Sequence, residues 1–342
     1  MSKKVLITGV SGFVGSHLAA FLLKHTDWTI YGLDKASSAR LDEIGAWETP
    51  RFKFIIHNLA SPVPSCLSEL LGGVELVINL ASESHVDRSI ASPADFVRNN
   101  VLLMISVLEF CRHHPKNPHL IHFSTDEVYG PSQVRYDVSG HWLEEAQEGD
   151  PHRPRNPYAA SKACQEDLAM SYVGTYGTAI TVLNSMNVWG DFQDAEKFIP
   201  KCIAAFLEGR AIEVHGGGTP WESGSRHWIN VEDVCRAILM VAENKPSHFQ
   251  LNIAGELYSN LEIAQLVAAI VGELSPTSLP CELREIDGQT ARPGHDLSYA
   301  LSDELIRTTL GWDQEKFLIN DLPKVVQFYI QNPQWLKSKL HT

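Results

Sequence analysis

Three glycines spaced three residues apart, Gly9, Gly12 and Gly15, place the strongest limit on the fold of this chain. They directly follow an apolar run at residues 5–8 and open an amphipathic stretch at residues 15–24. This pattern predicts a tight turn from a strand into a helix. Such a turn brings the backbone close to a pyrophosphate at the helix N-terminus, so it predicts a dinucleotide site.

The residue that ends the second predicted strand points to the cofactor. Asp34 follows the glycine turn by about the 20 residues typical of dinucleotide-binding βαβ units. A carboxylate at this place accepts hydrogen bonds from the ribose hydroxyls and repels a 2′-phosphate. The sequence therefore predicts NAD, while the nearby Lys35 and Arg40 leave NADP open.

Strand-like and helical segments continue to alternate through the first half of the chain. The predicted strands and helices lie at residues 5–8, 15–24, 29–33, 52–56, 76–80, 93–112, 120–124, 158–176 and 179–183. This alternation predicts an α/β fold, a Rossmann-like doubly wound parallel sheet with a smaller C-terminal α/β substrate domain. We expect residues 1–183 plus 227–257 to form the NAD-binding domain, and 184–226 plus 258–342 the nucleotide-sugar substrate domain.

Charge and cysteine content exclude some classes of partner. The formal net charge of -13 disfavours nucleic acid, because an acidic surface repels polyanions. Six widely spaced cysteines without CxxC or Cys/His spacing predict free thiols in a reducing cytoplasm and no metal site. No apolar stretch approaches the roughly 18 residues of a membrane span.

Two short segments carry the acid–base chemistry. Tyr158 and Lys162 lie four residues apart, one turn from each other on a helix face, so the ammonium is expected to lower the pKa of the phenol. Asp126 and Glu127 add more proton transfers than an alcohol oxidation requires. Neighbouring side chains of a strand point to opposite faces, so both reach one substrate only if the strand ends by Thr125. A helix cap with a first-turn acid is the alternative interpretation.

Together these motifs resemble the extended short-chain dehydrogenase/reductase superfamily. Within it the chain is similar to the nucleotide-sugar 4,6-dehydratases of the dTDP-glucose 4,6-dehydratase type, and the similarity extends almost from end to end. The segments that carry it are residues 79–89 (NLASESHVDRS), 124–130 (STDEVYG), 156–162 (NPYAASK), 196–200 (EKFIP) and 292–296 (RPGHD).

The resemblance implies a lyase with tightly bound NAD. A 4,6-dehydratase oxidises C4 of a nucleotide-diphosphate hexose, removes water across C5 and C6, and returns the hydride to C6, giving a 4-keto-6-deoxy sugar. Oxidation at C4 comes first because it makes the C5 proton acidic. A 5,6-dehydratase, epimerase or decarboxylase of the same fold is an alternative, and a non-catalytic NAD-binding sensor is another.

Five residues take catalytic roles by this resemblance. Tyr158 would accept the C4 hydroxyl proton, and Lys162 would lower its pKa and hold the nicotinamide ribose. Thr125, or the serine before it, would bind the C4 oxygen. Asp126 would be the acid at C6 and Glu127 the base at C5. Unlike environments push the pKa values of two close carboxylates apart, which suits one acid and one base.

The binding residues implied by the same resemblance fall into two sets. The cofactor set comprises Gly9, Gly12, Phe13, Val14, Gly15, Asp34, Asn58, Leu59, Ala81, Ser124, Tyr158 and Lys162. The substrate set comprises Ser84, His85, Asn187, Glu196, Lys197, Arg226, Arg292 and His295. In this superfamily the helices near 93–112 and 158–176 commonly pair as a four-helix bundle, so a homodimer is expected.

Two segments depart from the family pattern where the family holds the nucleotide. Residues 187–191 read NVWGD, and the long segment 216–228 contains Trp221, which could stack on a base or fill a loop. Residues 131–154 form a second long segment, predicted to be an acidic loop. The base and the hexose are therefore left open by the sequence.

Overall fold

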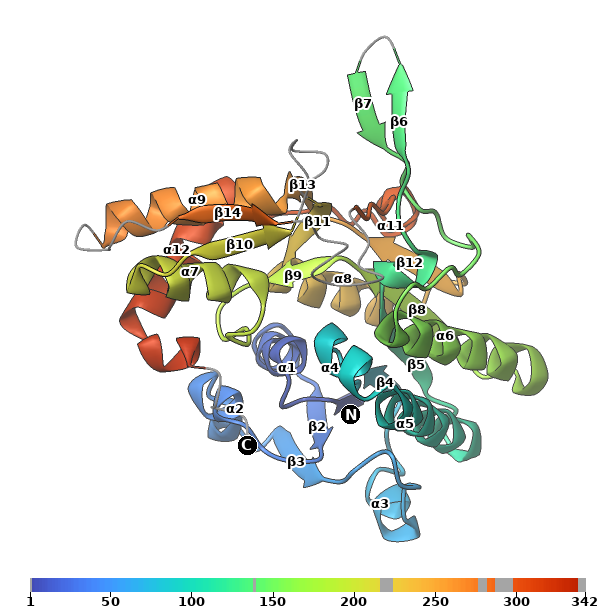
Figure 1. The fold of residues 1–342 in the computed structure, drawn as a ribbon. Helices are drawn as coiled ribbons and strands as arrows, with labels where there is room; N and C mark the ends of the chain where they lie inside the picture. Colours follow the sequence, from blue (N-terminus) through green and yellow to red (C-terminus); the bar gives the residue numbers. More distant parts are fainter. Residues whose placement is uncertain (1, 138–139, 216–223, 276–281, 287–297, 338–342) are drawn as a thin grey trace.

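A seven-stranded sheet forms the centre of the computed structural model, which describes residues 2–137, 140–215, 224–275, 282–286 and 298–337 (Figure 1). The strand order is β12-β8-β5-β4-β1-β2-β3, and every neighbouring pair is parallel. The strands are β1 (Lys4–Thr8), β2 (Thr29–Asp34), β3 (Phe52–Ile56), β4 (Leu76–Asn79), β5 (His119–Thr125), β8 (Ile180–Ser185) and β12 (Gln250–Ile253). The predicted fold class is confirmed.

Helices cover both faces of this sheet, as buried parallel strands require. One face packs against α1 (Phe13–His25) and α8 (Val231–Asn244), in an apolar cluster that includes Ile7 and Ile78. The other face packs against α5 (Pro93–His113) and α6 (Pro157–Tyr176), with Leu6 and Val77 in its cluster. Successive residues within β1, and likewise within β4, therefore point to opposite faces of the sheet and pack in different apolar clusters, as expected for a β-strand.

The predicted helices lie close to their expected bounds. Helix α5 begins at Pro93 with Ser92 at its N-cap position, although the Ser92 side chain caps no backbone N–H there. The shorter helices are α2 (Ala39–Glu43), α3 (Ser65–Leu70), α4 (Val86–Ala91) and α11 (Glu304–Leu310). Within the described part of the chain, none of the helices combines the length and apolar character that crossing a membrane requires.

A second, smaller unit has its own core around Trp189, Trp228 and Tyr329. Its helices are α7 (Phe198–Glu208), α9 (Asn260–Leu274) and α12 (Leu318–Gln331). Two small sheets accompany them, built from β9 (Asn187–Trp189), β11 (Ser225–Asn230) and β13 (Glu256–Ser259), and from β10 (Ile212–His215) and β14 (Leu283–Ile286). Of the segment 227–257, β12 joins the main sheet, whereas β11 pairs with β9 and β13. The exact domain bounds stay a prediction.

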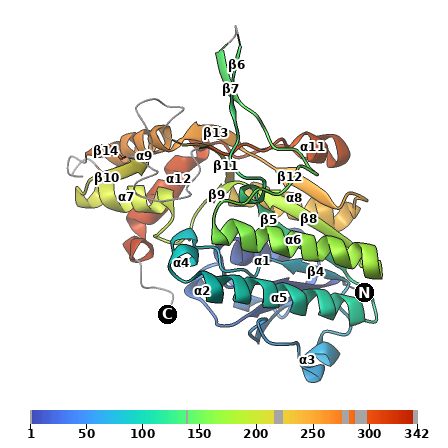
Figure 2. The ribbon, with the colours of Figure 1, turned by 45° about the vertical axis from the view of Figure 1, so that its right-hand side comes forward.

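The prediction of a long loop at residues 131–154 is wrong in one respect. It contains an antiparallel hairpin of β6 (Val134–Asp137) and β7 (Gly140–Leu143). The hairpin projects away from the rest of the molecule in both views (Figures 1 and 2). An ion pair between Arg135 and Glu144 joins the two sides of its base. None of the hairpin residues that the structure describes lines the cavity described below.

Candidate active site

The glycine turn brings two stretches of backbone into close contact. Gly9 has φ +70°, and a Cβ atom on it would lie 2.7 Å from the amide nitrogen of Ala81. A Cβ atom on Gly15 would lie 2.2 Å from the carbonyl oxygen of Gly9. Only glycine fits at both positions, and the first turn of α1 faces the cavity directly. This cradle fits a pyrophosphate bound at a helix N-terminus.

Asp34 holds the far side of the cradle at the end of β2. Its carboxylate accepts hydrogen bonds from the amide of Ser11 at 3.0 Å and from the amide of Lys35 at 2.7 Å. Burial raises the pKa of Asp34, and these amide bonds oppose the rise. The glycine cradle and this carboxylate together fit the ribose and pyrophosphate of NAD.

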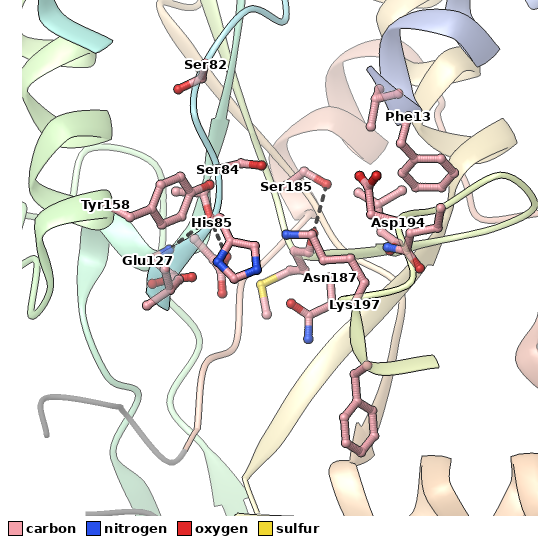
Figure 3. A pocket seen from close by; sticks show the side chains of 18 of the residues that line it. Phe13, Ser82, Ser84, His85, Glu127, Tyr158, Ser185, Asn187, Asp194 and Lys197 are labelled. Atoms are coloured by element: carbon pink, nitrogen blue, oxygen red, sulfur yellow. Dashed lines mark hydrogen bonds between the residues drawn. The ribbon is translucent and has the colours of Figure 1, made fainter. Parts of the chain in front are cut away.

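A cavity of about 470 Å³ opens beside the glycine turn and extends into the smaller unit (Figure 3). The predicted residues that line it are Gly9, Gly12, Phe13, Val14, Gly15, Ser84, His85, Ser124, Thr125, Asp126, Glu127, Tyr158, Lys162, Asn187, Glu196, Lys197 and Arg226. Those that do not line it are Asp34, Asn58, Leu59 and Ala81. Arg292, His295 and Trp221 lie outside the described residues.

The strand that precedes the two carboxylates ends at the residue that both of them need in order to reach one substrate. Strand β5 stops at Thr125, and a 3-10 turn (Asp126–Tyr129) begins at the next residue. The hydroxyl of Thr125 caps this turn by accepting the amide of Glu127 at 3.5 Å. Asp126 and Glu127 thus occupy the first turn of a short helix and also line the cavity, so the capping geometry and the site geometry coexist.

The two carboxylates have unlike environments. Asp126 is buried, and this burial, helped by the charge of Glu127, raises its pKa to about 7. A hydrogen bond from the Thr125 hydroxyl at 2.9 Å opposes the rise. Glu127 is less buried, and the amide of Asn156 donates to it at 2.8 Å. At neutral pH a substantial fraction of Asp126 therefore keeps its proton.

Tyr158 and Lys162 lie on the first turns of α6, whose N-cap Asn156 accepts the amide of Ala159 at 2.8 Å. Desolvation by the surrounding protein, helped by the charge of Glu127, raises the pKa of the Tyr158 phenol above its usual value. The prediction that Lys162 lowers this pKa is therefore wrong for the protein without bound cofactor and substrate. Burial also lowers the pKa of Lys162 to about 7, and its ammonium donates to the carbonyl of Phe123 at 2.8 Å.

Charged groups from several other elements also line the cavity. His85 contacts Glu196 at 2.5 Å between Nε2 and Oε2. Arg226 is buried on β11, with its guanidinium 5.0 Å from the centre of the Tyr299 ring. Figure 3 shows His85 beside Tyr158 and Glu127, and Asp194 beside Phe13 across the cavity. The predicted substrate residues that are described are therefore brought to the same cavity as the predicted catalytic ones.

Sequence reasoning missed further lining residues. They include Ser82, Ser185, Met186, Asp194, Lys201, Glu213, Trp228, Asn260 and Tyr299. Asp194 and Lys201 flank the EKFIP segment, so their position beside a known motif was an available signal. Glu213 on β10, Asn260 on α9 and Tyr299, which lies outside the named helices and strands, come from separate parts of the chain. No local pattern marks them, because only the tertiary fold brings them to the cavity.

The fold and the glycine cradle define a Rossmann-type dinucleotide-binding protein. The family described as "NAD dependent epimerase/dehydratase family" matches residues 5–254, and the chain belongs to that family. The predicted superfamily and the predicted cofactor, NAD, are confirmed.

Similar proteins extend over the full chain. A dTDP-glucose 4,6-dehydratase of Neisseria meningitidis serogroup B is 32% identical, with 99% of this chain and 96% of the relative covered. A solved structure of a dTDP-glucose 4,6-dehydratase from Streptomyces venezuelae, with NAD and TYD bound, is 29% identical with a TM-score of 0.83, covering 98% and 99% of the two chains. A UDP-glucuronic acid 4-epimerase from Bacillus cereus, in complex with UDP-glucuronic acid and NAD, is 25% identical with a TM-score of 0.81, covering 96% and 99%.

Proposed function

We propose that this chain is a nucleotide-diphosphate-hexose 4,6-dehydratase, a hydro-lyase. One observation carries the proposal. A tyrosine/lysine pair lies in the same cavity as two adjacent carboxylates, and one of these, Asp126, has a pKa of about 7. An epimerase that only moves a hydride at C4 has no use for that second acid–base pair. The full-length relatives named dTDP-glucose 4,6-dehydratase support the same reaction.

The first part of the reaction prepares C5 for deprotonation. Bound NAD supplies the acceptor for the C4 hydride and the donor for its return at C6. Tyr158 removes the proton of the C4 hydroxyl, and Thr125 hydrogen-bonds the same oxygen. Lys162 contributes a positive charge near the phenolate that forms. Because the pKa of Tyr158 is raised in the protein alone, this charge is needed at the moment of proton transfer.

The second part eliminates water from C5 and C6. Glu127 takes the C5 proton, which the neighbouring C4 ketone has made acidic. Asp126 gives its proton to the C6 hydroxyl, which leaves as water. A general acid works best with a pKa near the operating pH, and burial brings Asp126 to this range. The charge of Glu127 keeps the proton on Asp126 until it is used.

An assay with a panel of nucleotide-diphosphate hexoses tests this function. The purified protein with NAD is expected to release water and form a 4-keto-6-deoxy product, seen by its absorbance in alkali. Deuterium from solvent is expected at C5. If no water is lost and solvent deuterium enters only at C4 or C5, the protein is instead an epimerase. Silence over the whole panel despite bound NAD would favour a sensor.

We propose that two copies associate through α5 and α6. These helices lie side by side on one face of the molecule (Figure 2). Their outward surface exposes Leu102, Met170, Val173 and Tyr176. Analytical ultracentrifugation is expected to give a dimer that Met170→Glu with Val173→Glu converts to a monomer. A native monomer would contradict this proposal.

We propose that the protein works in the cytoplasm. Cys66, Cys111, Cys164 and Cys235 are thiols that form no disulfide. Thiols suit a reducing compartment, because disulfides persist mainly in oxidising ones. Detection of the protein in the extracellular or envelope fraction of the producing cell would contradict this.

A further inference from the structure

Glu166 is a buried carboxylate that does not line the cavity. It lies on α6 one turn after Lys162, and its side chain is 1% exposed. Hydrogen bonds reach it from four side chains. The donors are the Ser124 hydroxyl, the Asn184 amide at 2.8 Å, the Gln250 amide at 2.9 Å and the His152 imidazole at 3.2 Å. A buried carboxylate with this many donors is strongly fixed in place.

Three of the four donors come from neighbouring strands of the main sheet, and His152 comes from the segment before α6. Ser124 lies on β5, Asn184 on β8 and Gln250 on β12, which are adjacent in the order β12-β8-β5. Helix α6 thereby holds two successive residues of β5. Lys162 binds the carbonyl of Phe123 at 2.8 Å, and Glu166 binds the hydroxyl of Ser124. Ser124, which lines the cavity, is therefore held by a carboxylate that lies outside the cavity.

The electrostatic effect of Glu166 acts on Lys162. Burial lowers the pKa of Lys162 to about 7, and the charge of Glu166 opposes that loss. Without a nearby anion a buried ammonium gives up its proton, because desolvation penalises the charged form. A neutral lysine would offer Tyr158 no positive charge.

We propose that Glu166 is a positioning residue of this site, which fixes the hydroxyl of Ser124 at the cavity wall and favours the charged form of Lys162, one helical turn from Tyr158. The benefit to catalysis rests on the proposed function, whereas the effect on Lys162 does not. The carboxylate acts through these two residues and touches no reacting atom.

Other titratable groups lie near Glu166 and Lys162. His152 bonds Glu166 with Nε2 and Asp167 with Nδ1, at 3.1 Å, and Glu166 raises the pKa of His152. His122 on β5 is fully buried near Lys162, and its pKa is well below the usual value, so it stays neutral. Tyr129 lies close enough for the charge of Glu166 to help raise its pKa.

The direct test measures the protonation of Lys162 rather than activity. Lysine labelled with ¹³C at Cε is titrated by NMR, and the Lys162 signal is assigned by its loss in Lys162→Met. Glu166→Gln is expected to lower the pKa of Lys162 by about one unit or more, a tenfold change in the protonation constant. The matched control is Asp167→Asn, which removes an exposed charge one residue away (67% exposed) and is expected to leave the Lys162 pKa almost unchanged. An unchanged pKa in Glu166→Gln would overturn the proposal.

A second variant covers loss of folding. Should Glu166→Gln fail to fold, Glu166→Asp retracts the charge by one methylene and is expected to lower the Lys162 pKa in the same direction by a smaller amount. No change, or a rise, in a folded Glu166→Asp would also overturn the proposal.

A kinetic measurement connects this effect with the reaction. Reduction of bound NAD by substrate in a single turnover needs Tyr158 and Lys162 but not Asp126. As the pH rises, Lys162 loses its proton and the rate of NAD reduction falls. In Glu166→Gln this fall is expected to begin at a lower pH than in the native protein. An unmoved pH profile with a shifted Lys162 pKa would contradict the catalytic half alone. A native protein that no substrate reduces would instead contradict the proposed function and leave the NMR result standing.

Discussion

The two sides of the cavity are built differently. On the side formed by β5 and α6, Thr125, Asp126 and Lys162 are buried and held by neighbouring groups. On the side formed by the smaller unit, Arg226 is buried, but Glu196 and Lys201 are exposed and keep contact with water. Burial shifts pKa values, and hydration preserves them. The first side is thus suited to proton transfer, and the second to recognition of a charged nucleotide.

The largest expected effect comes from the buried side. Tyr158→Phe is expected to reduce the rate of NAD reduction by substrate by about 10³-fold or more, because the C4 hydroxyl loses its proton acceptor. Stopped-flow absorbance of reduced NAD measures this step. Tyr172→Phe is a matched control on the same helix, where the hydroxyl bonds Glu109 at 2.6 Å outside the cavity. Normal reduction in Tyr158→Phe would remove its role.

Glu127→Gln is expected to separate the two halves of the reaction. It keeps the shape of the side chain but removes the base, so water loss is expected to fall by about 10²–10³-fold. Slow reduction of bound NAD is expected to persist, while solvent deuterium no longer enters C5. Mass spectrometry of recovered sugar measures the exchange. Full exchange at C5 in this variant would rule out Glu127 as the base.

The raised pKa of Asp126 predicts a pH dependence with a definite sign. Asp126 must carry a proton to act as an acid, and its pKa of about 7 means that it loses this proton as the pH rises through 7. The ratio of the water-loss rate to the NAD-reduction rate is therefore expected to fall roughly tenfold per pH unit above that value. The ratio removes the effect of Lys162, which titrates in the same range. In Asp126→Asn the ratio is expected to be low and independent of pH.

The smallest expected effect comes from the hydrated side. Glu196→Gln removes the partner of His85, in a contact between two partly exposed side chains. Such pairs contribute about 0–1 kcal/mol, so a rise in KM of up to about fivefold with little change in kcat is expected. Glu144→Gln removes a comparable ion pair on the distant hairpin and is expected to change neither constant. A large fall in kcat in Glu196→Gln would place this carboxylate with the chemical side.

The features of the site that depend on local spacing were predictable from the sequence. The glycine turn, Asp34, and the end of β5 at Thr125 follow from rules about neighbouring residues, and the structure has them in place. The direction of the Tyr158 pKa could not be obtained this way. It depends on how much protein surrounds the phenol and on the charge of Glu127, and both depend on tertiary packing.

Contacts between side chains of distant elements were also not predictable from the sequence. Glu166 follows Lys162 by one turn in the sequence, yet its four donors come from three strands and a preceding segment. Glu213 and Asn260 line the cavity from parts of the chain with no motif. A helix-period pattern shows which residues face inward, but it does not show which side chains from other strands will meet them.

The place of β12 at the edge of the sheet has a consequence for the newly made chain. Strand β8 has its outer partner only after about 65 further residues have been synthesised, since β12 begins at Gln250. Until then the open edge of β8 can pair with another chain, and Glu166 lacks the donor on β12. The sheet and the buried network around Glu166 therefore both stay incomplete until β12 has been synthesised. A protein truncated before residue 250 would lose both together and is expected to aggregate.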